Sequence, residues 1–454
     1  MYPTAFLPFF LVLVLISLRS ANAWAACMGA VAFFQAASPI LLVAGGRISG
    51  IAPAYGLMFV GLWHVYGHLF ARRDLDRLRL TGSTETTLLI LFALVAIAGA
   101  LLFPRLFQGI VQVLPPREGL DSGFTYPLKP SGTNYIQAFY IACILMLYAT
   151  TRYLCAVGVV SRDRIVAGVA IGAAISVSLG FYQVAAFYLG LPWPAAVINS
   201  NLGLPHLLDQ TALGLKRMSA TFLEPSQMSA HFLGALGLVA LGLRRKLLGG
   251  LLLVALLLST SSTAYFGLAL LLLAWVGFDL TARARVVLPT LLAIIAVVGV
   301  AWMLDQSLTD GRLVESLIIG KFDQGSGAAR LNADLTALET LVQTFGLGAG
   351  VGSARASTLP ATLLATTGMP GFLLFAGFVF VVIRRSLRDT SDGGRALSLA
   401  LIGLLVGWSI SVPDVNFPLF WILAASVGAA YPRNRQMASV ALPQAGPVIH
   451  GARA

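Results

Sequence analysis

The sequence predicts an all-α polytopic membrane protein. Of its 454 residues, 58% are hydrophobic and only 11% are charged, which is far more apolar surface than one soluble core needs. Apolar runs of about 17 to 25 residues, each able to cross a hydrocarbon core about 30 Å thick, recur along the chain. Residues 1–435 are therefore expected to form one membrane domain. The Ala-, Pro- and Gly-rich residues 436–454 are expected to be a disordered tail.

The apolar runs predict about 12 or 13 membrane helices. The first run, 1–20, is similar to the apolar part of a signal peptide, but it lacks a basic start, so we interpret it as a retained membrane segment. The others are at 24–44, 51–70, 84–103, 134–160, 164–190, 224–243, 247–260, 262–280, 286–304, 359–383, 397–412 and 417–431.

The basic residues indicate the orientation of these helices. Short loops rich in Lys and Arg mark the cytoplasmic side, and they occur at 72–79, 161–164, 244–246, 281–285 and 384–389. The longer loops, 104–133, 191–223 and 305–358, then lie on the outward side. The net charge of +12 follows this topology and forms no basic stripe with interleaved aromatics, so nucleic acid is not an expected partner.

The outward segment 305–358 is the most polar part of the chain. Six of the 18 acidic residues lie between Asp305 and Glu339. Residues 330–344 have helical spacing, and the glycines of 346–352 are expected to form a flexible turn that delivers Arg355 to the start of the next membrane helix. The helix has an apolar stripe made of Leu331, Leu335, Leu338, Leu341 and Val342.

A second polar group precedes the membrane helix predicted to open at Pro225. Lys216 and Arg217 offer cations, and a helix N-terminus offers free amides, which together suit a diphosphate. Glu224 is a candidate general base toward a sugar hydroxyl. Alternatively, the cations bind lipid head groups and Glu224 is a helix-start carboxylate. His231, on the same helical face as Glu224, is interpreted as a structural histidine.

Other polar residues of the apolar runs allow simpler interpretations. Arg152 is either functional or extends to the cytoplasmic interface. The segment 259–268 is expected to make a tight turn whose hydroxyls satisfy helix ends. His64 and His68 lack a third ligand nearby in sequence, so we predict no metal site and no cofactor. The cysteines, Cys27, Cys143 and Cys155, lack paired spacing and are expected in the core.

Four segments, 216–234, 258–268, 326–355 and 353–372, together resemble the O-antigen ligase and O-antigen polymerase superfamily of bacterial membrane glycosyltransferases. The motif RMSATFLEPS contains Arg217 at the head of a helix. Arg330 opens the outward helix that ends at GLGAGVG. Ligase-like members carry a His-Asn before the Gly-x-x-Gly motif, whereas this chain has Arg355-Ala-Ser357 before GMPG. In this respect the chain is more similar to the exopolysaccharide polymerases.

The resemblance implies a C-type glycosyltransferase-like fold in the bacterial inner membrane, with a metal-independent active site facing the periplasm. It implies transfer of oligosaccharide repeat units from undecaprenyl diphosphate to a glycan acceptor. Arg217 and Arg330 would bind the donor diphosphate, assisted by Lys216, Arg355 and Ser357. Glu224 is the more speculative acceptor-side base. A flippase and a chain-length regulator are the partners that this resemblance implies.

Two alternatives remain open. One is an O-antigen ligase that transfers glycan to a lipid A core. The other is a transporter or flippase of lipid-linked sugar, which would need polar residues through the middle of the membrane. Arg152 is the only clear charged residue deep in a predicted span, and the other polar candidates gather on one side, so the sequence favours an enzyme.

Overall fold

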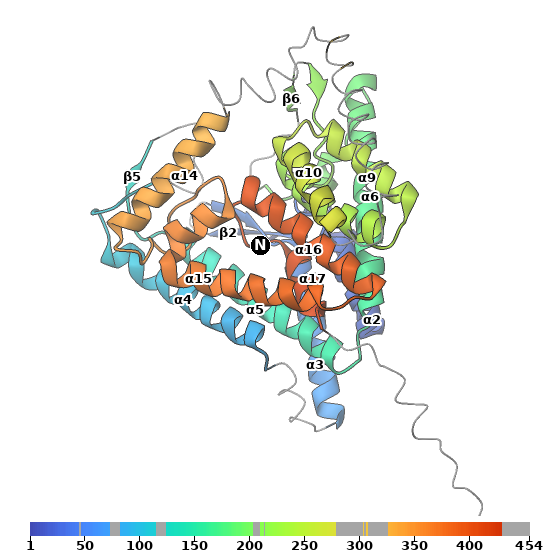
Figure 1. Ribbon diagram of the computed structural model, residues 1–454, viewed down its shortest axis with the longest axis horizontal. Coiled ribbons are helices and arrows are strands. Elements are labelled where there is room, and N and C mark those ends of the chain that lie inside the picture. The colour runs from blue at the N-terminus through green and yellow to red at the C-terminus, as the bar shows by residue number, and fades with distance from the viewer. Residues whose placement is uncertain are drawn as a thin grey trace, which may run out of the picture.

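The computed structural model (Figure 1) describes residues 1–44, 47–72, 82–114, 124–202, 209–212, 214–277, 303, 306 and 326–428. The predicted helix at 286–304, most of the outward loop before residue 326, and the tail from 436 lie outside the described residues.

The described chain is mostly helical, as the sequence predicts. Five helices are long and apolar enough to cross a membrane, namely α4 (Thr84–Leu106), α5 (Gly132–Ala156), α6 (Arg162–Leu189), α15 (Leu359–Leu387) and α16 (Asp392–Ile410). The other helices are α1 (Leu7–Arg19), α2 (Ala21–Val31), α3 (Pro53–Arg72), α7 (Ala195–Ile198), α8 (Pro225–Leu236), the π-helix η3 (Gly237–Gly242), α9 (Lys246–Leu258), α10 (Ser262–Gly277), α14 (Ser326–Gln343) and α17 (Pro418–Ser426).

Short antiparallel strands occur between the helices. They are β1 (Tyr2–Pro3), β2 (Ile40–Ala44) and β3 (Arg47–Gly50) in one sheet, the pair β4 (Gln112–Val113) and β5 (Tyr126–Pro127), and the pair β6 (Thr211–Ala212) and β7 (Leu215–Lys216). The prediction of one helix over 24–44 was therefore wrong. Pro39 has no amide hydrogen and disfavours a helical residue before it, so the apolar residues beyond it form β2 instead.

The helices pack as follows. Helices α4, α5 and α15 lie side by side, and α2 packs against α6 (Figure 1). Helix α16 packs against both α8 and α10. Its contact with α8 depends on Gly403, where a Cβ would lie only 2.7 Å from the Leu233 carbonyl oxygen. Small residues at such crossings let helix backbones approach closely in membranes.

The two ends of this bundle differ. At one end, called the site end, helices α3, α5, α8, α10, α15 and α17 begin, and the three small sheets lie in its loops. At the opposite end, α5 and α15 finish while α4, α6 and α16 begin.

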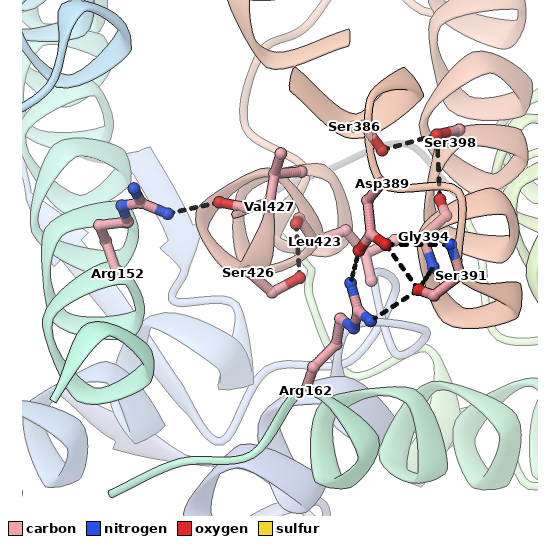
Figure 2. A network of polar contacts seen from close by, with 10 residues as sticks. All are labelled: Arg152, Arg162, Ser386, Asp389, Ser391, Gly394, Ser398, Leu423, Ser426 and Val427. Carbon is pink, nitrogen blue, oxygen red and sulfur yellow. Dashed lines mark hydrogen bonds and ion pairs between the residues drawn. The ribbon is translucent and has the colours of Figure 1, made fainter. Parts of the chain in front are cut away.

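Arg152 belongs to an ion-pair network at the opposite end. Its Nη2 lies 3.5 Å from Oε1 of Glu85, whose side chain is 3% exposed and also pairs with Arg385. Figure 2 shows the Arg152 guanidinium donating to the carbonyl of Val427, just beyond α17. Arg152 is thus a structural residue that joins α5 to α4 and to the end of α17.

A second part of this network connects α6 to the loop between α15 and α16. Arg162 Nη1 donates to Asp389 Oδ2 at 2.6 Å, and the Ser391 hydroxyl donates to Asp389 Oδ1 at 2.6 Å (Figure 2). Burial alone would raise the pKa of Asp389, but the hydrogen bonds from Arg162 and Ser391 hold that pKa below its usual value. Asp389 therefore remains ionised and clamps the two helix groups together.

We expect Glu85→Gln to destabilise the protein by about 3–5 kcal/mol, because it leaves the buried Arg152 without a carboxylate. The matched control is Asp392→Asn, which removes an exposed carboxylate from the first turn of α16. Thermal unfolding of the purified protein in detergent measures both. Equal melting temperatures for the two variants would contradict a structural role for this ion pair.

Candidate functional site

Arg217 is fixed at the site end by the turn between α9 and α10. Its Nε donates to the Thr260 Oγ1 at 3.0 Å and to the Ser259 carbonyl at 3.3 Å, and its Nη1 donates to Gln210 Oε1 at 3.3 Å. The turn was expected only to satisfy helix ends. Instead, the carbonyls and the Thr260 hydroxyl of this turn accept hydrogen bonds from the Arg217 guanidinium. The Ser/Thr-rich sequence 259–263 supplies such acceptors.

Glu224 stands directly before α8, which begins at Pro225 as predicted. Its carboxylate accepts a hydrogen bond from the Ser226 hydroxyl at 2.5 Å. The preceding loop is shaped by Gln183 of α6, whose Oε1 accepts from the amides of Ser219 and Ala220, each at 3.0 Å. Sequence reasoning missed Gln183, although a buried amide within an apolar span was a usable signal.

Arg217 is acted on by the charges of Glu224 and Arg330, which belong to other parts of the chain. Burial lowers the pKa of Arg217, the nearby Glu224 carboxylate raises it, and the Arg330 charge lowers it again. Arg330 lies in the first turns of α14, a helix that crosses the site end beside α15 and β4 (Figure 1). Arg217 is therefore repelled by a second cation, and a bound anion would offset that repulsion.

Asp334 holds α14 in this position. Its carboxylate accepts from the Ser357 amide at 2.8 Å, the Ser357 hydroxyl at 2.9 Å and the Thr358 amide at 3.2 Å. These groups precede α15, whose N-cap residue Thr358 supplies no capping side chain of its own. Ser357, predicted to bind substrate, is 4% exposed and uses its hydroxyl for this internal contact.

The face on which α14 packs is not its leucine stripe. The buried residues are Ala333, Ala337 and Thr340, which are small enough to let the helix approach β4 and α15 closely. By contrast, the exposed side chains include Leu331, Leu335, Leu338 and Val342. The helix and its stripe are as predicted, but the anchoring by Asp334 turns the stripe away from the protein.

The glycine turn after α14 is docked, not flexible as expected. Helix α15 is kinked at Gly368, where φ is 66°, and Pro370 cannot donate to the Thr366 carbonyl. The Gly350 amide donates to that carbonyl at 2.9 Å, and the Ala349 amide donates to the Ala365 carbonyl at 2.7 Å. The turn thus satisfies the backbone acceptors that the kink exposes.

The docked turn places Arg355 beside a carboxylate that the sequence did not single out. The Arg355 amide donates to the Leu114 carbonyl at 3.1 Å. Its Nη2 lies 3.7 Å from Asp414 Oδ2, in the loop between α16 and α17. An Asp between the two apolar runs 397–412 and 417–431 was a signal that could have found it.

Lys216 is the last residue of β7 and is buried, with 4% of its surface exposed. Its Nζ lies 5.4 Å from the centre of the Phe187 ring of α6. Burial lowers the pKa of Lys216, and the Asp209 carboxylate partly offsets this shift. Lys216 is therefore packed against α6.

Within the described part of the chain, no group of three His, Cys, Asp or Glu side chains could hold a metal ion. Neither a protein-family model nor a curated protein sequence matches this chain.

We expect Gly350→Ala to destabilise the turn more than Gly346→Ala. Both glycines have φ above +80°, which costs alanine about 1–2 kcal/mol. A Cβ at Gly350 would also lie 2.6 Å from the Gly99 carbonyl oxygen, whereas a Cβ at Gly346 meets nothing within 4 Å. Overpacking should add about 1–3 kcal/mol at Gly350 only. Thermal unfolding in detergent measures the difference, and equal losses would show that the turn is not tightly docked.

We expect Asp334→Ala to release α14, because three donors around Ser357 and Thr358 lose their acceptor. An unsatisfied buried donor costs about 1–3 kcal/mol. Hydrogen exchange followed by mass spectrometry should show faster exchange in α14 and at the start of α15. Glu339→Ala, at an exposed position of the same helix, is the control and should leave exchange at the start of α15 unchanged.

Proposed function

We propose that the protein is a membrane glycosyltransferase of the polysaccharide polymerase type. It transfers oligosaccharide repeat units from undecaprenyl diphosphate to the hydroxyl of a glycan acceptor, at the periplasmic face of a bacterial inner membrane. The observation that carries the proposal is that Arg217, held in place by Gln210 and the 259–260 turn, is also acted on by the charge of Arg330, a second cation from a separate segment of the chain. The sequence resemblance assigns these same arginines to the donor diphosphate.

The proposed reaction is a glycosyl transfer in which arginines bind the diphosphate leaving group. The acceptor oxygen attacks the anomeric carbon of the donor sugar, and the bond from that carbon to the diphosphate oxygen breaks. The diphosphate leaves with the electron pair, and a base takes the acceptor proton. Guanidinium groups bind phosphate oxygens through charge-assisted hydrogen bonds and stabilise the departing charge without a metal ion.

The fixed geometry of Arg217 supports this role. Its guanidinium is already oriented by Gln210 and the 259–260 turn, so little reorganisation accompanies donor binding. Glu224 beside it balances part of the positive charge in the absence of donor. The gathering of these charged side chains at the site end, outside the apolar helices, favours a transferase over a transporter.

The test uses purified protein in detergent with an undecaprenyl-diphosphate oligosaccharide and EDTA, and follows glycan length by gel and mass spectrometry. We expect ladders of added repeat units. Arg217→Ala and Arg330→Ala should each reduce extension by about 10²–10³-fold, because each removes a donor that stabilises developing charge. Arg164→Ala, an exposed arginine at the opposite end, is the matched control and should extend normally.

The other outcomes identify the alternatives. Transfer only after a lipid A core is added would mean an O-antigen ligase. No transfer, together with movement of lipid-linked sugar across liposome membranes, would mean a transporter. Full extension by the Arg217 and Arg330 variants would remove the proposed donor site.

A further inference from the structure

The loop between α16 and α17, residues 411–417, carries polar groups that none of the donor-binding arguments uses. We propose that this loop binds the acceptor glycan, with Asp414 as the base that takes the proton from the attacking hydroxyl and Asn416 as a second contact to the sugar. This inference rests on the proposed transferase function. It assigns the acceptor side of the same site.

The loop is attached directly to the turn that holds Arg217. The hydroxyls of Ser411 and Thr263 lie 2.5 Å apart, and Thr263 follows the 259–261 turn at the start of α10. At the far end of the loop, the Phe417 ring lies 5.0 Å from the His231 ring of α8, the helix that Glu224 precedes. Asp414 is therefore held at the site end, between elements that also position the proposed donor clamp.

The carboxylate of Asp414 is accessible. It faces Arg355 at 3.7 Å, and the two side chains are 41% and 40% exposed. At this length the contact is a loose ion pair, so its oxygens can still accept a hydrogen bond from a sugar hydroxyl. A base must reach the proton that it removes, and the exposed carboxylate of Asp414 is open to an incoming hydroxyl.

The neighbours of Asn416 that the structure describes fix its position but leave its side-chain oxygen without a hydrogen-bond donor. The side-chain Nδ2 of Asn416 donates to Gln137 Oε1 of α5 at 3.0 Å, and the backbone carbonyl of Asn416 accepts from the Tyr55 hydroxyl at 3.1 Å. Its Oδ1 is buried and has no hydrogen-bond partner within the described structure. Such an orphaned acceptor is costly, and a sugar hydroxyl is a donor that would satisfy it.

Glu224 is less suited to the same step. One of its oxygens accepts the Ser226 hydroxyl at 2.5 Å, and its charge acts on Arg217. It therefore belongs to the donor side, where it orients and neutralises a cation. Asp414 pairs with a different arginine, Arg355, so the structure supplies one carboxylate to each side of the reaction.

The proposal is tested by separating acceptor chemistry from donor binding. Wild type, Asp414→Asn and Arg217→Ala are compared in the extension assay, and also by the thermal shift that undecaprenyl diphosphate alone produces. We expect Asp414→Asn to lose extension by about 10²–10⁴-fold, the usual contribution of a general base, while its lipid-induced shift stays at the wild-type value. Arg217→Ala should lose both glycan extension and the lipid-induced thermal shift. Asp392→Asn, an exposed carboxylate at the opposite end, should lose neither.

A second variant covers the case in which Asp414→Asn fails to fold. Asn416→Ala should raise the KM for the acceptor glycan and leave the lipid-induced shift intact. Extension by Asp414→Asn within about threefold of wild type would overturn the role as base. An unchanged acceptor KM in Asn416→Ala would overturn the glycan contact.

Failure of the proposed function has a different signature. Wild-type protein would then show neither extension nor a lipid-induced shift. In that case, saturation-transfer NMR with the free oligosaccharide tests the loop by itself. A signal that is present in wild type and lost in the Asn416 variant would support the glycan site, and its absence from wild type would overturn it.

Discussion

The kink of α15 is the constraint on which the site end depends. Gly368 and Pro370 interrupt the helix, and the carbonyls of Ala365 and Thr366 lose their usual donors inside a membrane protein. An unsatisfied backbone carbonyl in such surroundings costs several kcal/mol. The amides of the glycine turn satisfy both carbonyls, so the turn has one position. That position fixes the segment carrying Arg355 and Ser357, and through Asp334 it also fixes α14 with Arg330.

The charged side chains are arranged differently at the two ends of the bundle. At the opposite end, Glu85 and Asp389 each face arginine, so the ion pairs are closed and serve to join helices. At the site end, Arg217 and Arg330 lie close enough for one charge to act on the other, with Glu224 beside them. Like charges held together cost free energy, which a bound anion recovers. This difference is the physical basis for proposing that an anion binds at the site end.

Contacts between distant segments connect the parts of the site end in series. The 259–261 turn holds Arg217, Thr263 joins that turn to the 411–417 loop, and Asp414 of this loop faces Arg355. Two residues further along the chain, Ser357 bonds to Asp334 of α14. Because each link is anchored to a different helix, movement of one helix would be transmitted to both the cations and the carboxylates.

The sequence by itself determined much of the local structure: the five helices long and apolar enough to cross a membrane, the start of α8 at Pro225, the glycine turn, and the amphipathic helix that carries Arg330. Periodicity and helix-start chemistry are local properties, so they can be read along the chain. Only the tertiary structure decided which face of α14 is buried, that Gln183 shapes the loop before α8, and that Asp414 meets Arg355. Those outcomes depend on contacts between residues far apart in sequence. An amphipathic pattern shows that a helix has two faces, but only its neighbours decide which face is covered.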